Sequence, residues 1–435
     1  MGRRPETHPV VVTGVGPIAA NGRGRDEFWG AILAGRTGTR SLPFDWATVP
    51  PFRCLVGAPV NPPPPEEALL TPAEARLLDP VTVLALAATR LALEDAGFRP
   101  ELADERKNRW RVPGIDPERA GTVIGTGIGG ITSVERSHTQ WIREHVIRGT
   151  FRYAVPMLIP NAPAGQVAIK FGLQGECKAV TTACAAGTMA IGDAFRLLRD
   201  GELDLAVTGG VEKALGDEDG FSLVGFDVLR TVSRRNDDPE HASRPFDRDR
   251  DGFVMADGAG ILVLEREEHA RARGARILAR VTGYAATCDA HSMMALAPDG
   301  EQIVRVMRGA LASADRRPED VVYVNAHGTA TRLNDPSEAR AIRRALGGAA
   351  DGILVSSTKA MTGHAIGASG GLEAIVTALS LSAGIAHRCV NLVEVDPECD
   401  VVPFPRENTP IRPGVALSNS FGFGGHNACL VLETA

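Results

Sequence analysis

The sequence predicts a layered α/β fold made of two similar halves. Short strands of buried type, such as residues 203–207, alternate with helical patterns along the chain, which is typical of sheets covered by helices. Two segments, beginning at Cys184 and at His364, share the order strand, polar residue, small-residue helix. The 435 residues are enough for one large duplicated unit.

Composition and charge narrow the class of protein. A hydrophobic content of 44% allows a full core, and a net charge of −6 gives no reason to expect nucleic acid as a partner. There is no uninterrupted run of about 18 apolar residues, so we expect no membrane span. The seven cysteines are scattered and contain no CxxC pair, which favours a reducing compartment. We therefore expect a cytoplasmic protein without a membrane partner.

Turn and cap signals divide the N-terminal part of the chain. Residues 10–12 form a β-branched run that predicts a strand, and the glycines directly after it predict a turn. Residues 26–34 predict an amphipathic helix. The proline-rich residues 41–72 predict an extended exposed segment, and Thr71 is the expected N-cap of the next helix.

The same signals place the remaining elements in order. Helices are expected at residues 81–96, 184–200, 336–346 and 366–381. Residues 121–130 are expected to be a strand that runs into a glycine turn. Further strands are expected at residues 179–182, 203–207, 260–265, 321–325, 353–357, 390–392, 415–418 and 428–432. Loops or irregular segments are expected at residues 100–118, 156–166, 215–226 and 244–252.

Cys184 is the central residue of this pattern. It follows a short strand and precedes a helix that should end at Gly201. The free N–H groups and the positive end of the dipole at a helix N-terminus favour thiolate over thiol. A buried structural cysteine is the alternative, because free cysteines are among the most buried residues.

Four polar clusters follow predicted strands. They contain Cys184, His327 with Thr329 and Thr331, Lys359 with His364, and the glycine-rich segment 419–427. Functional sites in open α/β sheets gather at the carboxyl ends of the strands. A cysteine and two histidines at such positions suit covalent thioester chemistry.

The motifs resemble those of the β-ketoacyl-[acyl-carrier-protein] synthases, most of all synthase II of type II fatty acid synthesis. The resemblance runs from about residue 9 to 433 and rests on TACAAGT at Cys184, NAHGT at His327, TKAMTGH ending at His364, NSFGFGG at 419–425, and RPFD with RDGFV in 244–254. It implies a thiolase-type fold: two βαβαβαββ halves in a five-layer αβαβα sandwich, usually a homodimer. The halves would be residues 1–275, carrying the cysteine, and 276–435, carrying both histidines.

The resemblance also implies a decarboxylative Claisen condensation. Cys184 would take an acyl group from the phosphopantetheine of acyl carrier protein. His327 and His364 would promote decarboxylation of malonyl on a second carrier, and the enolate would attack the acyl group. The backbone N–H groups of Cys184 and Phe423 would form the oxyanion hole. No metal or resident cofactor is implied.

Other residues receive supporting roles from the same resemblance. Lys359 and Glu338 would pair as electrostatic support of the site. Phe423 would gate the acyl pocket. The remaining expected substrate contacts are Thr329, Thr331, Met189 and Phe421.

Three departures from the family pattern leave the substrate open. Met189 replaces a usual histidine, Met294 replaces a hydroxyl side chain, and the loop 215–226 is longer and acidic. A specialised, polyketide-type ketosynthase that elongates or cyclises a particular carrier-bound chain is therefore an alternative, and so is a heterodimer with a related subunit. A non-catalytic chain-length partner subunit would lack the nucleophile. A degradative thiolase would carry a second cysteine near the C-terminal glycine loop, where Phe421 and Phe423 stand here.

Overall fold

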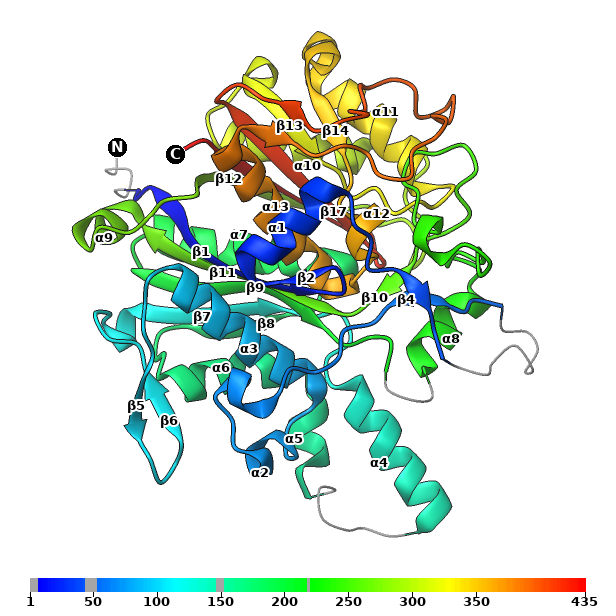
Figure 1. Ribbon diagram of the computed structural model, residues 1–435. Helices are drawn as coiled ribbons and strands as arrows, with labels where there is room; N and C mark the ends of the chain where they lie inside the picture. Colours follow the sequence, from blue (N-terminus) through cyan, green and yellow to red (C-terminus); the bar gives the residue numbers. More distant parts are fainter. Residues whose placement is uncertain (1–6, 44–52, 146–151, 217–219) are drawn as a thin grey trace.

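Two central helices organise the fold. The computed structural model describes residues 7–43, 53–145, 152–216 and 220–435. Helices α7 (Ala186–Arg199) and α13 (Ser369–Ala383) lie at the centre and contact strands of both halves. In Figure 1 the N-terminal half, in blue to green, occupies the lower part, and the C-terminal half, in yellow to red, the upper part.

The two halves contain the same sheet. The first half has the strand order β8-β7-β9-β11-β1, and the second has β14-β13-β17-β18-β12. The first-half strands are β1 (Val10–Ala19), β7 (Ala120–Gly125), β8 (Cys177–Val180), β9 (Leu205–Glu212) and β11 (Gly258–Arg266). Their counterparts in chain order are β12 (Ala279–Cys288), β13 (Val321–Asn325), β14 (Leu354–Ser356), β17 (Val415–Gly422) and β18 (His426–Glu433). β1 and β12 pair antiparallel, so the two sheets join along one edge.

Further helices cover the outer faces and complete the layers. α3 (Pro80–Asp95) packs on β1 and β11, and α6 (Ala162–Phe171) packs on β7 and β8. α10 (Glu301–Ser313) packs on β12 and β18, and α11 (Asn334–Leu346) packs on α10. This arrangement confirms the predicted duplicated α/β sandwich.

The duplication extends to the turns that begin the central helices. Single 3₁₀ turns, Ala183–Ala185 and Ile366–Ala368, lead into α7 and α13. The first residue of each turn has a left-handed backbone, with φ of +49° at Ala183 and +43° at Ile366. Gly367, not His364, therefore occupies the position that Cys184 has in the first half.

The first strand is longer than predicted. The glycine turn expected after residue 12 is absent, and β1 continues to Ala19. A Cβ atom on Gly16 would lie 2.0 Å from the carbonyl oxygen of Ala88 in α3. These glycines thus allow a helix to approach the strand closely rather than turn the chain.

Two expected loops contain regular structure. Residues 100–118 include a hairpin of β5 (Glu101–Asp104) and β6 (Arg109–Arg111), seen projecting at the lower left of Figure 1. The buried ammonium of Lys170 anchors the hairpin by donating to the carbonyl of Asn108 at 2.9 Å. The loop prediction for residues 100–118 rested on their many charged side chains. It was wrong because the hairpin is anchored by Lys170, a residue distant in the sequence.

The segment 156–166 is mostly helical rather than irregular. α5 (Ala154–Leu158) and α6 occupy it, and Pro163 lies in the first turn of α6, where a missing N–H costs nothing. The expected loop 215–226 contains the start of α8 (Phe221–Val228), while its residues 217–219 lie outside the described part.

The proline-rich segment 41–72, predicted to be exposed and extended, is in part buried: it contains the buried strand β4 (Val56–Ala58) and a 3₁₀ helix, Pro65–Ala68, while its residues 44–52 lie outside the described part. Residues 390–392 form no strand, and only the two-residue strands β15 (Ile385–Ala386) and β16 (Thr409–Pro410) flank that region. The predicted cap at Thr71 is present as a full capping box with Glu74, at the start of α2 (Pro72–Ala75).

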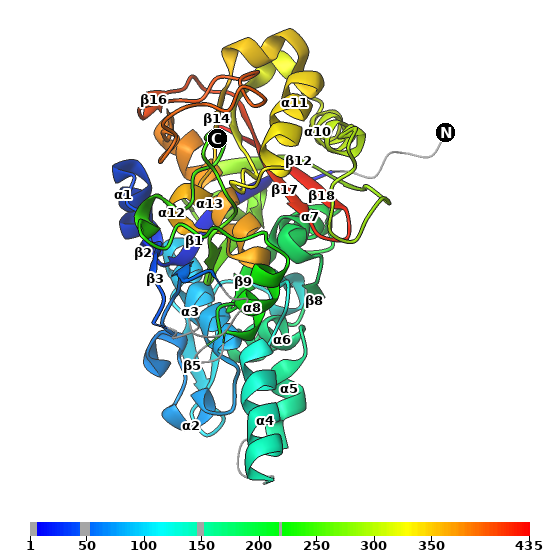
Figure 2. The same cartoon turned by 90° about the vertical axis from the view of Figure 1, so that its right-hand side faces the viewer.

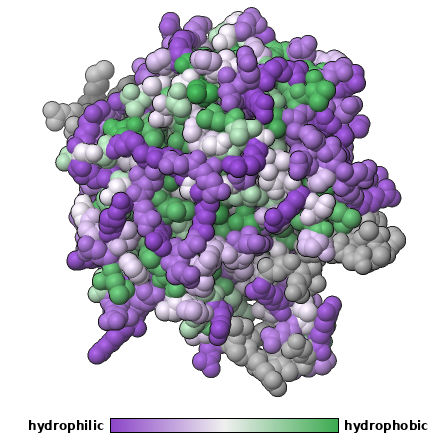
Figure 3. Space-filling model, viewed as in Figure 1, coloured by the Kyte–Doolittle hydropathy of each residue, from purple (hydrophilic) through white to green (hydrophobic). Residues whose placement is uncertain are grey.

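Hydrophilic side chains lie mainly at the surface, and a long apolar helix lies in the interior. In Figure 3 hydrophilic groups cover most of the visible face. Among the described residues, Ile366–Ala383 is the one segment long and apolar enough to cross a membrane, and 89% of it is buried inside the fold. Its apolar character is explained by its place between the two sheets.

Candidate active site

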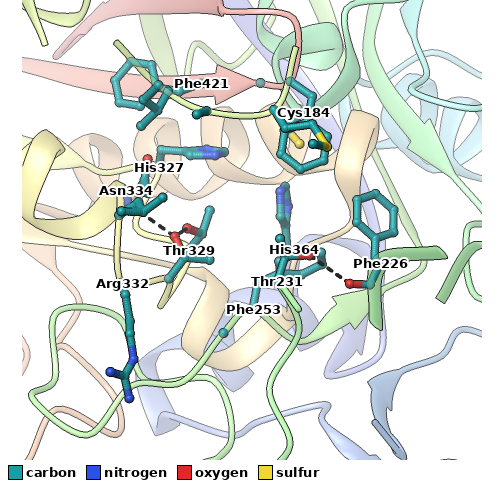
Figure 4. A pocket seen from close by; sticks show the side chains of 18 of the residues that line it. Cys184, Phe226, Thr231, Phe253, His327, Thr329, Arg332, Asn334, His364 and Phe421 are labelled. Atoms are coloured by element: carbon teal, nitrogen blue, oxygen red, sulfur yellow. Dashed lines mark hydrogen bonds between the residues drawn. The ribbon is translucent and has the colours of Figure 1, made fainter. Parts of the chain in front are cut away.

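One cavity of about 310 Å³ collects the residues predicted from the motifs. Cys184, His327 and His364 line it together, and Figure 4 shows both imidazole rings directed toward the space below Cys184. Cys184 and His327 closely follow the carboxyl ends of β8 and β13, and His364 follows the short helix α12 (Lys359–Thr362) after β14. The cavity therefore lies where the two halves meet, at the position that the sheet topology favours.

Cys184 stands in the turn before α7. Gly422 on β17 lies so close that a Cβ there would be 3.1 Å from the backbone nitrogen of Cys184, which places the 422–425 loop beside the thiol. Burial raises the pKa of Cys184 to about 12, although the Lys359 charge and the backbone N–H of Phe423 act in the opposite direction. The expected preference for thiolate is thus outweighed by burial.

His327 is fixed from two sides. Its backbone N–H and that of Gly328 each donate to the buried carboxyl of Glu338 at 2.8 Å. The Lys359 ammonium lies 3.3 Å from its Nδ1 and donates to its carbonyl at 2.6 Å. Glu338 therefore holds the backbone of His327, and Lys359 holds both its carbonyl and its ring.

His364 is held by the second half's central helix. Its Nδ1 lies 2.9 Å from the hydroxyl oxygen of Ser369, at the start of α13. Its ring is perpendicular to that of His327, with centroids 5.4 Å apart. Burial, with a further contribution from the Lys359 charge, holds the pKa of both histidines well below the usual range. Both imidazoles are therefore neutral at pH 7.

The predicted partner of Lys359 is wrong. Lys359 forms its ion pair with Glu373 on α13, not with Glu338. Glu338 instead accepts the two backbone N–H groups described above, and burial raises its pKa to about 7. Glu373 is the one charged residue in an otherwise apolar helix, and such a buried charge requires a partner. That signal could have identified it from the sequence.

A second buried carboxylate was also missed. Glu212, at the end of β9, accepts the backbone N–H groups of Gly127 at 2.6 Å and of Gly367 at 3.0 Å. It thereby ties the loop after β7 to the turn that mirrors Cys184. Burial raises the pKa of Glu212 to about 7.

The expected substrate contacts divide into two groups. Thr329, Thr331, Phe421 and Phe423 line the cavity, and the hydroxyl oxygens of the two threonines lie 2.9 Å apart. Met189 does not line it and packs, partly buried, against the core.

Aromatic rings and exposed residues shape the rest of the cavity. The rings of Phe226 and Phe423 lie 6.0 Å apart beside Cys184. At the mouth, Arg230 and Arg332 are exposed, and Met294 and Leu333 are exposed apolar residues on the same rim. In Figure 4 the Arg332 guanidinium points away from Cys184 and the two histidines.

The described residues form no candidate metal centre. Within residues 7–43, 53–145, 152–216 and 220–435, no group of three or more His, Cys, Asp and Glu side chains is placed to hold a metal ion.

Comparison with protein families identifies two matching domains. Residues 7–270 match the family described as "Beta-ketoacyl synthase, N-terminal domain", and residues 278–393 match "Beta-ketoacyl synthase, C-terminal domain". These matches agree with the resemblance inferred from the motifs.

Curated relatives are similar over nearly the whole chain. The 3-oxoacyl-[acyl-carrier-protein] synthase 2 of Synechocystis sp. is 41% identical over 432 residues, covering 98% of both chains. The enzyme of the same name from Staphylococcus aureus strain COL is 41% identical over 425 residues, again with 98% of both chains covered.

Solved structures are similar in fold. A type II polyketide ketosynthase complex with its acyl-carrier protein, described as bound to the hexaketide, gives a TM-score of 0.86 at 31% identity, covering 99% of this chain and 100% of that one. A β-ketoacyl synthase from Burkholderia phymatum gives 0.86 at 33% identity, with 98% and 100% covered.

Proposed function

The chain belongs to the β-ketoacyl synthase family, and we propose that it condenses malonyl on acyl carrier protein with an acyl group held on Cys184. It is an acyltransferase-type condensing enzyme of that family. The observation that carries the residue assignment is the convergence of Cys184, His327 and His364 on one cavity. The nucleophile is present, which speaks against a non-catalytic chain-length partner subunit.

In the first half-reaction the Cys184 sulfur attacks the acyl thioester carbon. The new carbon–sulfur bond forms on Cys184, the bond to the pantetheine sulfur breaks, and the thiol proton passes to the departing thiolate. Burial raises the pKa of Cys184, so the proton has to leave as attack proceeds rather than beforehand. The backbone N–H of Phe423, which faces the thiol, and that of Cys184 are the proposed donors to the oxyanion.

In the second half-reaction malonyl occupies the same cavity. Loss of CO₂ leaves an enolate, and its carbon attacks the acyl carbonyl on Cys184. The new carbon–carbon bond forms, the bond to Cys184 breaks, and the departing sulfur takes up a proton from solvent water. Neutral imidazoles can donate to the enolate oxygen without forming an ion pair with the malonyl carboxylate, which would slow CO₂ loss. The low pKa values of His327 and His364 support this role.

The carrier's phosphopantetheine is substrate in this proposal, and no resident cofactor takes part. Thr329 and Thr331 are the proposed contacts of the arm, and Phe423 the gate of the acyl pocket. We assign residues 1–275 to the half with the nucleophile and 276–435 to the half with the histidines; the family matches, which end at 270 and begin at 278, support this boundary.

A specialised ketosynthase is the second candidate. The similar polyketide ketosynthase and the methionine at the rim, Met294, favour it. Intact-protein mass spectrometry with a panel of acyl-carrier thioesters, wild type beside Cys184→Ala, separates the two. Straight-chain loading followed by two-carbon elongation supports fatty acid synthesis, and loading of unusual chains alone supports the specialised role. No loading of Cys184 from any thioester would refute the nucleophile.

We also propose a cytoplasmic homodimer that pairs through β8. This strand is the edge of the first sheet, and α4 (Ile131–Glu144), α5 and α6 lie along the same side in Figure 2. Exposed apolar residues gather on these helices: Trp141, Ile142, Val155 and Ile169. An open strand edge flanked by apolar groups favours association. Sedimentation of the wild type and of Ile169→Glu tests the proposed dimer. We expect a dimeric wild type and a weaker dimer in the variant, and a monomeric wild type would refute the proposal.

A further inference from the structure

A charge-dense turn, residues 244–252, has no role in the proposed chemistry, yet its last two residues, Asp251 and Gly252, line the cavity. Its arginine, Arg250, is 3% exposed and does not line the cavity. Its Nε donates to the carbonyl of Thr331 at 3.0 Å, and its Nη2 donates to the carbonyl of Arg332 at 3.4 Å. Both acceptors belong to residues whose side chains line the cavity.

The opposite side of the same guanidinium is fixed to the rest of the fold. Nη1 donates to the carbonyl of Asp247 at 2.9 Å and to the carboxylate of Asp396. Arg250 thus connects the 329–334 loop to the rest of its own turn and to Asp396. The planar fork of an arginine can serve several acceptors in fixed directions, which a lysine ammonium does not reproduce.

Asp335 fixes the other end of the loop. Its buried carboxylate accepts the backbone N–H of Thr329 at 3.1 Å and that of Phe246 at 2.8 Å, and it lies 3.8 Å from Arg250. Phe246 has a left-handed backbone, with φ of +64°, a conformation that needs such support. Gly328, which precedes the loop, packs against both Ser357 and this turn, because a Cβ there would be 2.6 Å from the Ser357 Cβ and 3.1 Å from the Phe246 ring.

We propose that Arg250 is a positioning residue that holds the Thr329 and Thr331 hydroxyls in place for the pantetheine arm. This inference rests on the proposed function. It assigns Arg250 to binding of the arm, not to the reactivity of Cys184, because its partners are the loop carbonyls rather than the thiol or the imidazoles.

The test compares Arg250→Gln with Arg248→Gln. Arg248 is a matched control because it lies on the same turn, is 53% exposed and pairs with Glu394 at the surface. We expect the KM for acyl and malonyl carrier thioesters to rise about tenfold in Arg250→Gln, with kcat changed less than about threefold. Alkylation of Cys184 by iodoacetamide should match wild type. A KM equal to that of Arg248→Gln overturns the proposal, as does a parallel loss of alkylation.

A milder variant covers the case in which Arg250→Gln does not fold. Asp396→Asn weakens one hydrogen-bond partner of Arg250. The effect of Thr331→Ala on KM is then measured both in wild type and in the Asp396→Asn background. If Arg250 acts through the loop, Thr331→Ala raises KM less in the Asp396→Asn background than in wild type. Equal effects in both backgrounds overturn the proposal. A wild type that turns over no carrier thioester would instead refute the proposed function.

Discussion

The Nζ of Lys359 lies 3.3 Å from Nδ1 of His327. An ammonium group only donates, so Nδ1 is the acceptor and the ring proton is on Nε2. The same ammonium donates to the His327 carbonyl at 2.6 Å, so a single cation fixes both the tautomer and the orientation of the ring. The resulting Nε2–H is the group that a developing enolate oxygen requires.

Replacing Lys359 with methionine should affect stability and chemistry separately. The buried Glu373 carboxylate would lose its partner, and breaking a buried ion pair costs about 3–5 kcal/mol of unfolding free energy. His327 would also lose the donor that sets its tautomer. We expect both losses, measured by denaturant unfolding and by CO₂ release from malonyl-carrier protein.

The double variant Lys359→Met with Glu373→Gln separates the two effects. It removes the unpaired charge, so most of the stability should return, whereas CO₂ release should stay low. Recovery of both properties would contradict the role assigned to the Lys359–His327 contact.

Alanine in place of either His327 or His364 should spare acylation and impair decarboxylation. Removing one preorganised donor to a developing oxyanion costs about 10²–10³-fold in rate, and neither imidazole contacts Cys184 in the proposed acyl transfer. The measurements are acyl loading by intact mass and the rate of CO₂ release. His138→Ala, an exposed position on α4, is the control. Loss of acyl loading in both histidine variants would contradict this division of labour.

The reactivity of free Cys184 should keep rising with pH. Burial raises its pKa to about 12, and the thiolate is the reactive form. The logarithm of the rate at which iodoacetamide alkylates Cys184 should therefore increase by about one per pH unit through pH 9. The rate is measured by mass spectrometry of the Cys184 peptide. A plateau near neutral pH would mean that the helix N-terminus outweighs burial.

The place of Cys184 in the chain follows from local sequence, whereas the pKa of its thiol does not. The position of Cys184 at a strand–helix turn could be read from the sequence, because glycines, small residues and a strand pattern are local signals. The pKa of Cys184 is raised by the burial of its thiol, and that burial depends on segments distant in the sequence, such as Gly422 on β17, which packs against Cys184. Local dipole arguments therefore favoured a thiolate that the packed structure does not favour.

The duplication and the polar clusters could be predicted because they rest on local sequence patterns. Most buried strands and the helices after Cys184 and His364 follow from periodicity, and the ends of parallel strands share one edge. Pairings across elements do not follow from spacing. The motif resemblance paired Lys359 with Glu338, whereas in the folded chain α13 brings Glu373 to Lys359.

The cavity mouth gives a prediction about the carrier protein itself. Arg230 and Arg332 are exposed on the rim, where the body of a carrier would lie once its arm enters the cavity. Acidic side chains on a carrier would be attracted by these charges, and such rim charges mainly affect association and its salt dependence. We expect Arg230→Glu with Arg332→Glu to raise the KM for carrier-bound malonyl about tenfold at low salt.

Carrier-free malonyl-pantetheine distinguishes docking from damage to the site. It enters the same cavity but has no protein surface, so the charge reversals should leave its KM nearly unchanged. The carrier effect should shrink in high salt, because exposed charges are screened beyond about 10 Å at 0.1 M. Arg106→Glu, exposed between β5 and β6, controls for net charge. If malonyl-pantetheine and the carrier substrate lose affinity equally, the arginines act on the arm rather than on the carrier.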